Sequence, residues 1–168
     1  GESHGPAIGV VLENLPSGIP VDMDFIGREM ARRQAKKGGL STTRIEADRP
    51  EILSGVFNGR TTGTPLCAVI QNGNTHSSDY DTIKTLARPS HADYTGRVRY
   101  GGFNDYRGGG HFSGRLTASM VFAGAVMKLW LRGQGIEIGS HILRLGPIED
   151  IPFDLAHPPV EEFPAIAA

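Results

Sequence analysis

Three short stretches hold the residue types that proton transfer and anion binding require. They are GESHG at residues 1–5, RPSHADY at residues 88–94 and RGGGHFSGR at residues 107–115. His4 and His91 are candidates for general acid–base chemistry, because the unperturbed pKa of histidine is about 6.5. Arg88 could grip an anion, and Asp93 could orient an imidazole or pair with an arginine. For each histidine taken alone, a surface position beside a turn is the alternative interpretation.

The third stretch is unusually bare. Gly108, Gly109 and Gly110 lead into a helical pattern, where free backbone N–H groups and the helix dipole favour an anion. Arg115 would lie in the first helical turn, where a cation opposes the dipole, and this mismatch indicates a negatively charged ligand. The stretch lacks the Gly-Lys-Ser/Thr ending of a P-loop, and no clear strand precedes it as in a dinucleotide-binding loop. A glycine-rich connection without a ligand is the alternative.

Basic residues near the first predicted helix allow two interpretations. They are Arg28, Arg32, Arg33, Lys36, Lys37 and Arg44. They form either a solvated helix face or an electrostatic trap for a multiply charged substrate. His4, His91 and His111 with Asp93 or Glu2 also suggest a metal, but their spacings match no standard ligand motif, so we expect none. Together the clusters predict an enzyme that acts on a small phosphorylated or carboxylated molecule.

Hydrophobic periodicity predicts the elements that must position these clusters. A strand is expected over residues 7–13, and a helix capped by Asp22 is expected to run to about Arg33. A strand–turn–strand unit is expected over residues 43–72, with hairpin breaks near Asn58-Gly59 and Thr61–Thr64. Residues 72–102 read as a long functional loop with one short helix. A central, well-buried helix is expected from an N-cap at Ser113 to Arg132, followed by a strand over residues 136–145.

Length and composition bound the class of protein. The chain has 168 residues, 17 basic and 18 acidic side chains and a net charge of −1, which gives no case for general nucleic-acid or membrane affinity. No apolar run is long enough to span a bilayer. The single cysteine, Cys67, cannot form an internal disulfide, so a reducing, cytoplasmic compartment is expected. Both ends look cut, which suggests a segment of a longer polypeptide.

Several motifs in register resemble the chorismate synthase family from Gly1 to about Ile142. They are GESHG, RR at 32–33, TTRIEAD, EILSGVFNGRTTGTP, SSDY, RPSHADYTG, NDYRGGG and SGRLTA. The resemblance implies an α+β fold, a β-α-β sandwich whose antiparallel sheets enclose central helices. It also implies a lyase of the shikimate pathway of aromatic amino acid biosynthesis, which converts 5-enolpyruvylshikimate 3-phosphate into chorismate and phosphate by an anti 1,4-elimination. Reduced FMN is the implied cofactor, and a homotetramer the implied assembly.

The resemblance also implies roles for individual residues. His4 falls on the histidine assigned to protonating the departing phosphate, and His91 on the one assigned to protonating the reduced flavin. The residues that match substrate-binding arginines are Arg33, Arg88, Arg115 and, more weakly, Arg44. The implied cofactor-binding residues are Gly110, His111, Phe112 and Ser113. On this interpretation the bare loop lets flavin and phosphate approach a helix N-terminus.

Departures from the family pattern affect the flavin site. His111 stands where the commoner form has arginine, and Leu116 where it has glutamate. Gly39 replaces an arginine associated with nucleotide contacts, which counts against the use of NADPH for flavin reduction. Family members are considerably longer, so we expect residues 1–168 to be the N-terminal portion of the domain and inactive alone. A scaffold that binds anions without chemistry is one alternative, and a His/Asp metal hydrolase is a weaker one.

Overall fold

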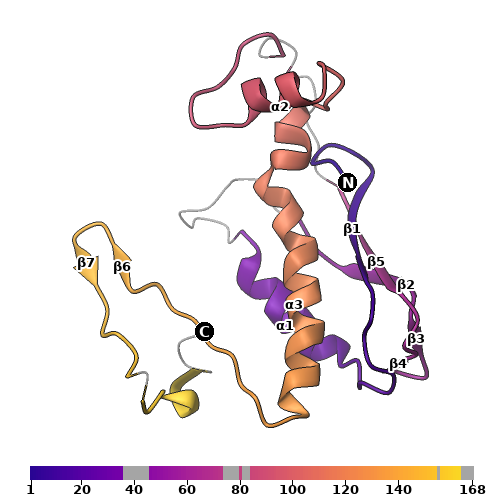
Figure 1. Ribbon diagram of the computed structural model, residues 1–168, viewed down its shortest axis with the longest axis vertical. Coiled ribbons are helices and arrows are strands. Elements are labelled where there is room, and N and C mark those ends of the chain that lie inside the picture. The colour runs from indigo at the N-terminus through magenta and orange to yellow at the C-terminus, as the bar shows by residue number, and fades with distance from the viewer. Residues whose placement is uncertain (36–45, 74–79, 81–83, 155, 164–168) are drawn as a thin grey trace.

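An antiparallel sheet carries the N-terminal loop. Its strands, in spatial order, are β1 (Ala7–Leu12), β5 (Leu66–Gln71) and β2 (Pro50–Ser54). The central strand β5 buries every second side chain, Leu66, Ala68 and Ile70, as expected for a strand that packs one face on a core. The computed structural model describes residues 1–35, 46–73, 80, 84–154 and 156–163 (Figure 1).

The first helix has the cap and the buried face that its sequence predicts. α1 (Met23–Arg33) begins after Asp22, whose carboxylate accepts hydrogen bonds from the backbone N–H groups of Asp24 and Phe25 at 2.9 and 3.0 Å. Its inward-facing residues are Phe25, Ile26 and Met30. This face packs on the long helix α3 (Thr117–Arg132), and α3 in turn contacts β1 and β5 (Figure 1).

The long helix begins later than its sequence indicates. Ser113 accepts a hydrogen bond from the backbone N–H of Arg115, but it caps the short 3₁₀ turn η3 (Gly114–Leu116), and the α-helix follows that turn. α3 is central, as predicted, but it is less buried than the prediction of a well-buried helix requires. Phe122 and Val126 are buried on one side, whereas Met120 is 69% exposed on the other.

A tight hairpin interrupts the chain between β2 and β5. β3 (Val56–Phe57) pairs with β4 (Arg60–Thr61) across Asn58 and Gly59, which both have positive φ, at 49° and 73°. This is the backbone that a two-residue Asn-Gly turn requires. The hairpin break predicted at this dipeptide is confirmed.

The segment over residues 72–102, predicted to be a long loop with one short helix, contains α2 (Asp93–Arg99) in its described part. The 3₁₀ element η2 (Arg107–Phe112), which holds the glycine run, follows this segment. Figure 1 places both at the end of the molecule where α3 begins, beside the N-terminus. Segments that are far apart in the sequence therefore meet at this end.

The strand predicted over residues 136–145 is wrong. The strands after α3 are the two-residue β6 (Arg144–Leu145) and β7 (Ile148–Glu149), which pair with each other, and a 3₁₀ turn η4 (Val160–Glu162) follows. The alternating apolar pattern finds no partner strand within the part of the chain that the structure describes. Ile142 is accordingly 73% exposed.

The core lies between the three-stranded sheet and the helices α1 and α3. It includes Ile8, Leu66, Ile70, Ile26, Met30, Phe122 and Val126. The mixture of helices with antiparallel sheets agrees with the predicted α+β class. In the described residues the sheet covers one side of the helices, so the second sheet of the expected sandwich stays a prediction. No helix in these residues has the length and apolar character needed to cross a membrane.

Candidate active site

Two histidines from separate motifs pack on neighbouring glycines of η2. A Cβ atom built on Gly108 would lie 2.5 Å from Nε2 of His4, and one built on Gly109 would lie 2.8 Å from Nε2 of His91. Both glycines have positive φ, at 57° and 83°, which disfavours any residue with a side chain. The loop is therefore bare so that two imidazoles can lie against its backbone.

This finding corrects the predicted reason for the glycine run. We expected the space around the glycines to admit a ligand to the N-terminus of a helix. Protein atoms fill that space instead, because a Cβ on Gly110 would also collide with the backbone carbonyl oxygen of Asp105. The α-helix itself starts only at Thr117, so the glycines are not its first turn.

Hydrogen bonds fix the N-terminal loop that presents His4. The N–H of Ser3 donates to the carbonyl oxygen of Gly110 at 3.1 Å, and the N–H of Gly5 donates to that of Glu2 at 3.0 Å. The His4 ring meets the Tyr80 ring edge to face, with their centroids 5.1 Å apart. These contacts hold the imidazole of His4 against the glycine loop.

His91 is held by a carboxylate that also binds an arginine. Arg88 donates to both carboxylate oxygens of Asp93, from Nε at 2.7 Å and from Nη2 at 2.8 Å. Oδ1 of Asp93 lies 2.8 Å from Nδ1 of His91. The hydrogen bonds from the Arg88 side chain hold the pKa of Asp93 well below its usual range, although partial burial opposes them. Asp93 therefore both orients the imidazole and pairs with an arginine, two roles that the sequence left open.

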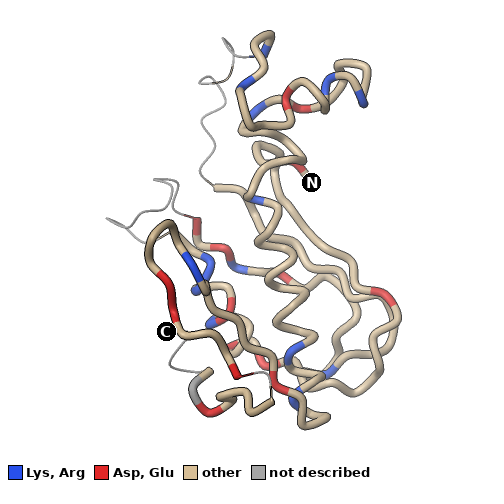
Figure 2. The backbone as a smooth tube through the Cα atoms, turned by 60° about the vertical axis from the view of Figure 1, so that its left-hand side comes forward, with Lys and Arg blue, Asp and Glu red and all other residues tan. Residues whose placement is uncertain are grey.

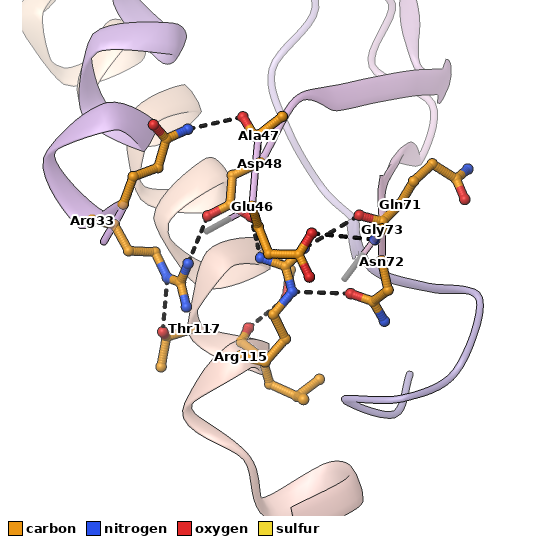
Figure 3. A network of polar contacts seen from close by, with 12 residues as sticks. Arg33, Glu46, Ala47, Asp48, Gln71, Asn72, Gly73, Arg115 and Thr117 are labelled. Carbon is orange, nitrogen blue, oxygen red and sulfur yellow. Dashed lines mark hydrogen bonds and ion pairs between the residues drawn. The ribbon is translucent and has the colours of Figure 1, made fainter. Parts of the chain in front are cut away.

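A second charged cluster joins α1 to the start of α3. Asp48 is 4% exposed and accepts hydrogen bonds from Arg115 and from Nη1 of Arg33, the latter at 2.7 Å (Figure 3). Nε of Arg33 donates to the hydroxyl of Thr117 at 3.1 Å, and its Nη2 donates to the carbonyl oxygen of Gly114 at 3.1 Å. Two cations thus share one buried carboxylate. The carboxylate of Glu46 lies in the same network, where it accepts a hydrogen bond from the backbone N–H of Gly73 at 3.2 Å (Figure 3).

Asp48 also corrects the argument made from Arg115. We took a cation in the first helical turn as a sign of an anionic ligand. The structure supplies the anion from the protein, because the side chain of Arg115 is 5% exposed and pairs with Asp48. Substrate binding by Arg33 and Arg115 stays a prediction, and the inference from the dipole mismatch no longer supports it.

Asn72 connects the charged cluster to the histidine loop. Its Oδ1 accepts a hydrogen bond from Nε of Arg115 at 2.9 Å, and its Nδ2 donates to the carbonyl oxygens of Glu2 and Gly5 at 3.2 and 2.9 Å. Those two carbonyls flank His4. Sequence reasoning missed Asn72, which carries no motif signal, whereas Asp48 closes the TTRIEAD motif and could have been found there.

The four predicted cofactor residues differ in accessibility. Gly110 is buried and its carbonyl accepts from Ser3, while the hydroxyl of Ser113 caps η3. His111 and Phe112 are exposed, and the Phe112 ring lies against Gly96 of α2. Arg44, the remaining predicted substrate residue, lies outside the described residues. In those residues, no group of three or more His, Cys, Asp or Glu side chains could hold a metal ion.

Comparison with known proteins assigns the family. The sequence model of the family described as "Chorismate synthase" matches residues 1–164. The chain belongs to the chorismate synthase family. Chorismate synthases of Thermococcus kodakarensis and Pyrococcus abyssi are 49% and 50% identical to it over 149 residues, which is 89% of this chain and 42% of each relative. That of Methanopyrus kandleri is 49% identical over 162 residues, 93% of this chain and 42% of the relative.

A solved structure agrees with this assignment. The structure described as "Crystal Structure of Chorismate Synthase" superposes with a TM-score of 0.65 at 34% identity, over 89% of this chain and 37% of that one. The chain therefore spans about two-fifths of the length of the chorismate synthases that it matches.

Two observations test whether this end of the molecule fits a flavin. The exposed rings of His111 and Phe112 lie with their centroids 6.3 Å apart and offer an aromatic surface. Oε2 of Glu2 is buried and accepts no hydrogen bond from the described residues. It lies 3.0 Å from the position of a Cβ on Gly110, so a carboxylate acceptor without a hydrogen bond from the described residues adjoins the segment assigned to the cofactor. The residues present fit an aromatic, hydrogen-bonding cofactor.

Proposed function

We propose that this chain forms part of a chorismate synthase that eliminates phosphate from 5-enolpyruvylshikimate 3-phosphate to give chorismate. The observation that carries the proposal is the packing of His4 and His91 on the adjacent glycines Gly108 and Gly109. Three motifs, the first of which lies more than 80 residues before the other two, meet there around two groups that can move protons near neutral pH. Elimination of a phosphate requires such groups, because the leaving group and the proton donor must be positioned together.

The two histidines have separate roles in this proposal. His4 protonates the departing phosphate, and its loop is fixed by hydrogen bonds to Gly110 and Asn72. His91 transfers a proton to the reduced flavin. Asp93 faces its Nδ1 atom at 2.8 Å, and Nη2 of Arg88 lies 3.4 Å from its Nε2 atom, so both groups position the imidazole.

The arginines supply the positive charge that the substrate requires. The substrate has one phosphate and two carboxylates, and arginine binds both kinds of group with paired hydrogen bonds. We assign substrate binding to Arg33 and Arg115, two cations that share the carboxylate of Asp48. We also assign substrate binding to Arg88, because it lies beside His91. Arg44 is assigned to substrate binding on the family resemblance alone.

We assign reduced FMN to the segment Gly110, His111, Phe112 and Ser113, in which His111 and Phe112 are exposed and Gly110 is buried. When bound, it would supply electron density transiently to the elimination and recover it, without net redox change. His111 and Phe112 would contact the ring system, and Glu2 offers a buried acceptor beside them. NADPH as the source of reducing equivalents remains disfavoured by Gly39.

The remaining assignments follow from the family and the length of its members. We propose that residues 1–168 are the N-terminal portion of a larger catalytic domain and are inactive alone. We also propose that the complete protein is a cytoplasmic homotetramer whose fold closes into the β-α-β sandwich. Sedimentation of the complete gene product measures the assembly directly.

Phosphate release by the complete gene product tests the lyase activity. The assay supplies reduced FMN and 5-enolpyruvylshikimate 3-phosphate without oxygen. We expect release that depends on reduced flavin and falls at least about 100-fold in His91→Ala, because general acid–base catalysis typically contributes about 10²–10⁴-fold. His157→Ala is the matched control, since that histidine has an 87% exposed side chain far along the chain and should leave the rate unchanged.

Two outcomes would count against the proposal. A folded, flavin-bound protein that releases no phosphate would reject the lyase activity and favour a scaffold that binds anions without chemistry. Equal rates for His91→Ala and the wild-type protein would leave the lyase intact but remove the role assigned to His91.

A further inference from the structure

A cavity of about 260 Å³ opens beside α2, and Arg88 is the one lining residue to which the family resemblance assigns a role. Its lining comes from the segment before α2, from α2 itself and from the loop that leads to η2. The lining residues are Lys84, Thr85, Arg88, Asp93, Arg97, Gly102, Asn104 and Tyr106. The volume suits a small ligand and is below that of the pockets that bury drug-sized molecules.

The cavity has an excess of positive charge. Lys84, Arg88 and Arg97 contribute three cations, and Asp93 contributes one anion. Asp93 is already paired with Arg88, while Lys84 and Arg97 form no ion pair with any residue that the structure describes. The upper part of Figure 2 shows basic residues on the chain segments around α2. Two cations that form no ion pair among the described residues face one small cavity, and this arrangement favours an anionic ligand.

Neutral groups in the lining narrow the class of anion. The side chains of Thr85 and Asn104 can each donate a hydrogen bond, in addition to the donors of Lys84 and Arg97. Donors that converge from three chain segments match the oxygens of a tetrahedral oxyanion better than the two oxygens of a planar carboxylate. A phosphate group combines this shape with a charge between one and two at neutral pH.

We propose that this cavity binds phosphate, either as the free ion or as the phosphate group of a larger molecule. Lys84 and Arg97 bind its oxygens, and Thr85 and Asn104 complete the contacts. The site adjoins the chemistry assigned above, because Arg88 and Asp93 line the cavity and also contact His91. Phosphate binding here does not depend on the proposed lyase function, although a lyase that produces phosphate would use such a site beside its proton donor.

Calorimetric titration of the complete gene product with inorganic phosphate tests the site without flavin or substrate. We expect saturable binding of phosphate, with an affinity that falls about tenfold or more in Lys84→Ala and in Arg97→Ala. The loss of one charge-assisted hydrogen bond accounts for a change of about this size. Arg99→Ala is the matched control, because Arg99 lies on the same helix but outside the cavity lining. Its affinity for phosphate should stay within about twofold of the wild type.

Binding at other positions would appear as a component that none of these substitutions changes. Equal weakening by Arg97→Ala and Arg99→Ala would show general attraction by charge and overturn the proposal, as would the absence of any component sensitive to Lys84 or Arg97. The side chains of Lys84 and Arg97 are exposed, so circular dichroism of the two alanine variants should show an unchanged fold.

Further titrations distinguish free phosphate from the phosphate group of a larger molecule. They also distinguish the proposal for the cavity from the proposal of lyase activity. Tighter binding of 5-enolpyruvylshikimate 3-phosphate than of inorganic phosphate, lost in Arg97→Ala, would identify the phosphate of a larger molecule as the occupant. Equal affinities would identify the free ion. A protein that binds phosphate through Lys84 and Arg97 but releases none from the substrate would reject the lyase and keep the cavity. A protein that releases phosphate from the substrate but does not bind phosphate through Lys84 and Arg97 would support the lyase and reject the phosphate site.

Discussion

At this site, two glycines matter because they have no side chain and so leave room for neighbouring rings. Gly108 and Gly109 have no side chain, and that absence brings two imidazoles from distant motifs against one short loop. The composition alone shows many glycines, 23 in the chain, but not which neighbours they accommodate. The difference between a glycine that serves a ligand and one that serves a histidine appears only in three dimensions.

Gly109→Ala should therefore impair both stability and activity more than the addition of one methyl group suggests. The new Cβ would lie 2.8 Å from the His91 ring, and its backbone has φ of 83°. We expect about 1–2 kcal/mol of lost stability from the left-handed backbone and at least a tenfold loss of phosphate release from the displaced imidazole. Gly114→Ala is the control, because no atom lies within 4 Å of its added Cβ and Gly114 has no positive φ. Equal effects of the two substitutions would contradict the packing argument.

At the scale of elements, the Arg33–Asp48–Arg115 cluster joins α1, the segment before β2 and the turn before α3 (Figure 3). A buried carboxylate between two cations contributes little compared with a well-packed apolar group, but removing it leaves buried charge without a partner. Asn72 extends this connection to the histidine loop through its bond with Arg115. Loss of Asp48 should therefore affect both stability and the position of His4.

Asp48→Ala should lower the free energy of unfolding by about 3–5 kcal/mol, as is typical when one partner of a buried pair is removed. Alanine also fits poorly at φ of 44°, whereas asparagine tolerates that backbone and keeps one of the two acceptor oxygens. Asp48→Asn should consequently lose less stability than Asp48→Ala. Glu137→Ala, which removes an exposed partner of Arg132, should cost less than about 1 kcal/mol. Urea unfolding at pH 7 measures all three, and an Asp48→Ala loss as small as that of Glu137→Ala would refute the argument.

Local signals explain which elements could be predicted. α1 has a capping aspartate and an apolar face at helical spacing, and β1, β5 and the Asn-Gly turn carry equally local signals. Residues 136–145 alternate like a strand but lack a partner in the described chain, and strand formation depends on a partner. The motifs named His4, His91 and Arg88, yet their contacts with the glycines and Asp93 depend on distant segments. Asn72 was missed for the same reason.

At the scale of the whole molecule, three partly buried carboxyl groups among the described residues have pKa values lowered by neighbouring cations. Hydrogen bonds from Arg88 and Arg107 lower the pKa values of Asp93 and Asp105 respectively. Burial alone would raise the pKa of Glu29, but the hydrogen bond and charge of Lys128, together with Arg32, lower it overall. These groups connect α2, the loop before η2, and the α1–α3 contact, so acid should weaken separate parts of the structure together.

The sign of the pH effect follows from the lowered pKa values. A carboxyl group with a folded-state pKa below its unfolded value, about 4, contributes stability that is fully present above pH 4. That contribution is lost as the pH falls from about 4 through the folded-state values. We therefore expect the urea midpoint of the complete gene product to drop between pH 4 and pH 2. Asp93→Asn should show a shallower drop, because the residue with the most strongly lowered pKa no longer titrates. An equally steep drop in Asp93→Asn would show that the Arg88–Asp93 pair does not couple folding to protonation.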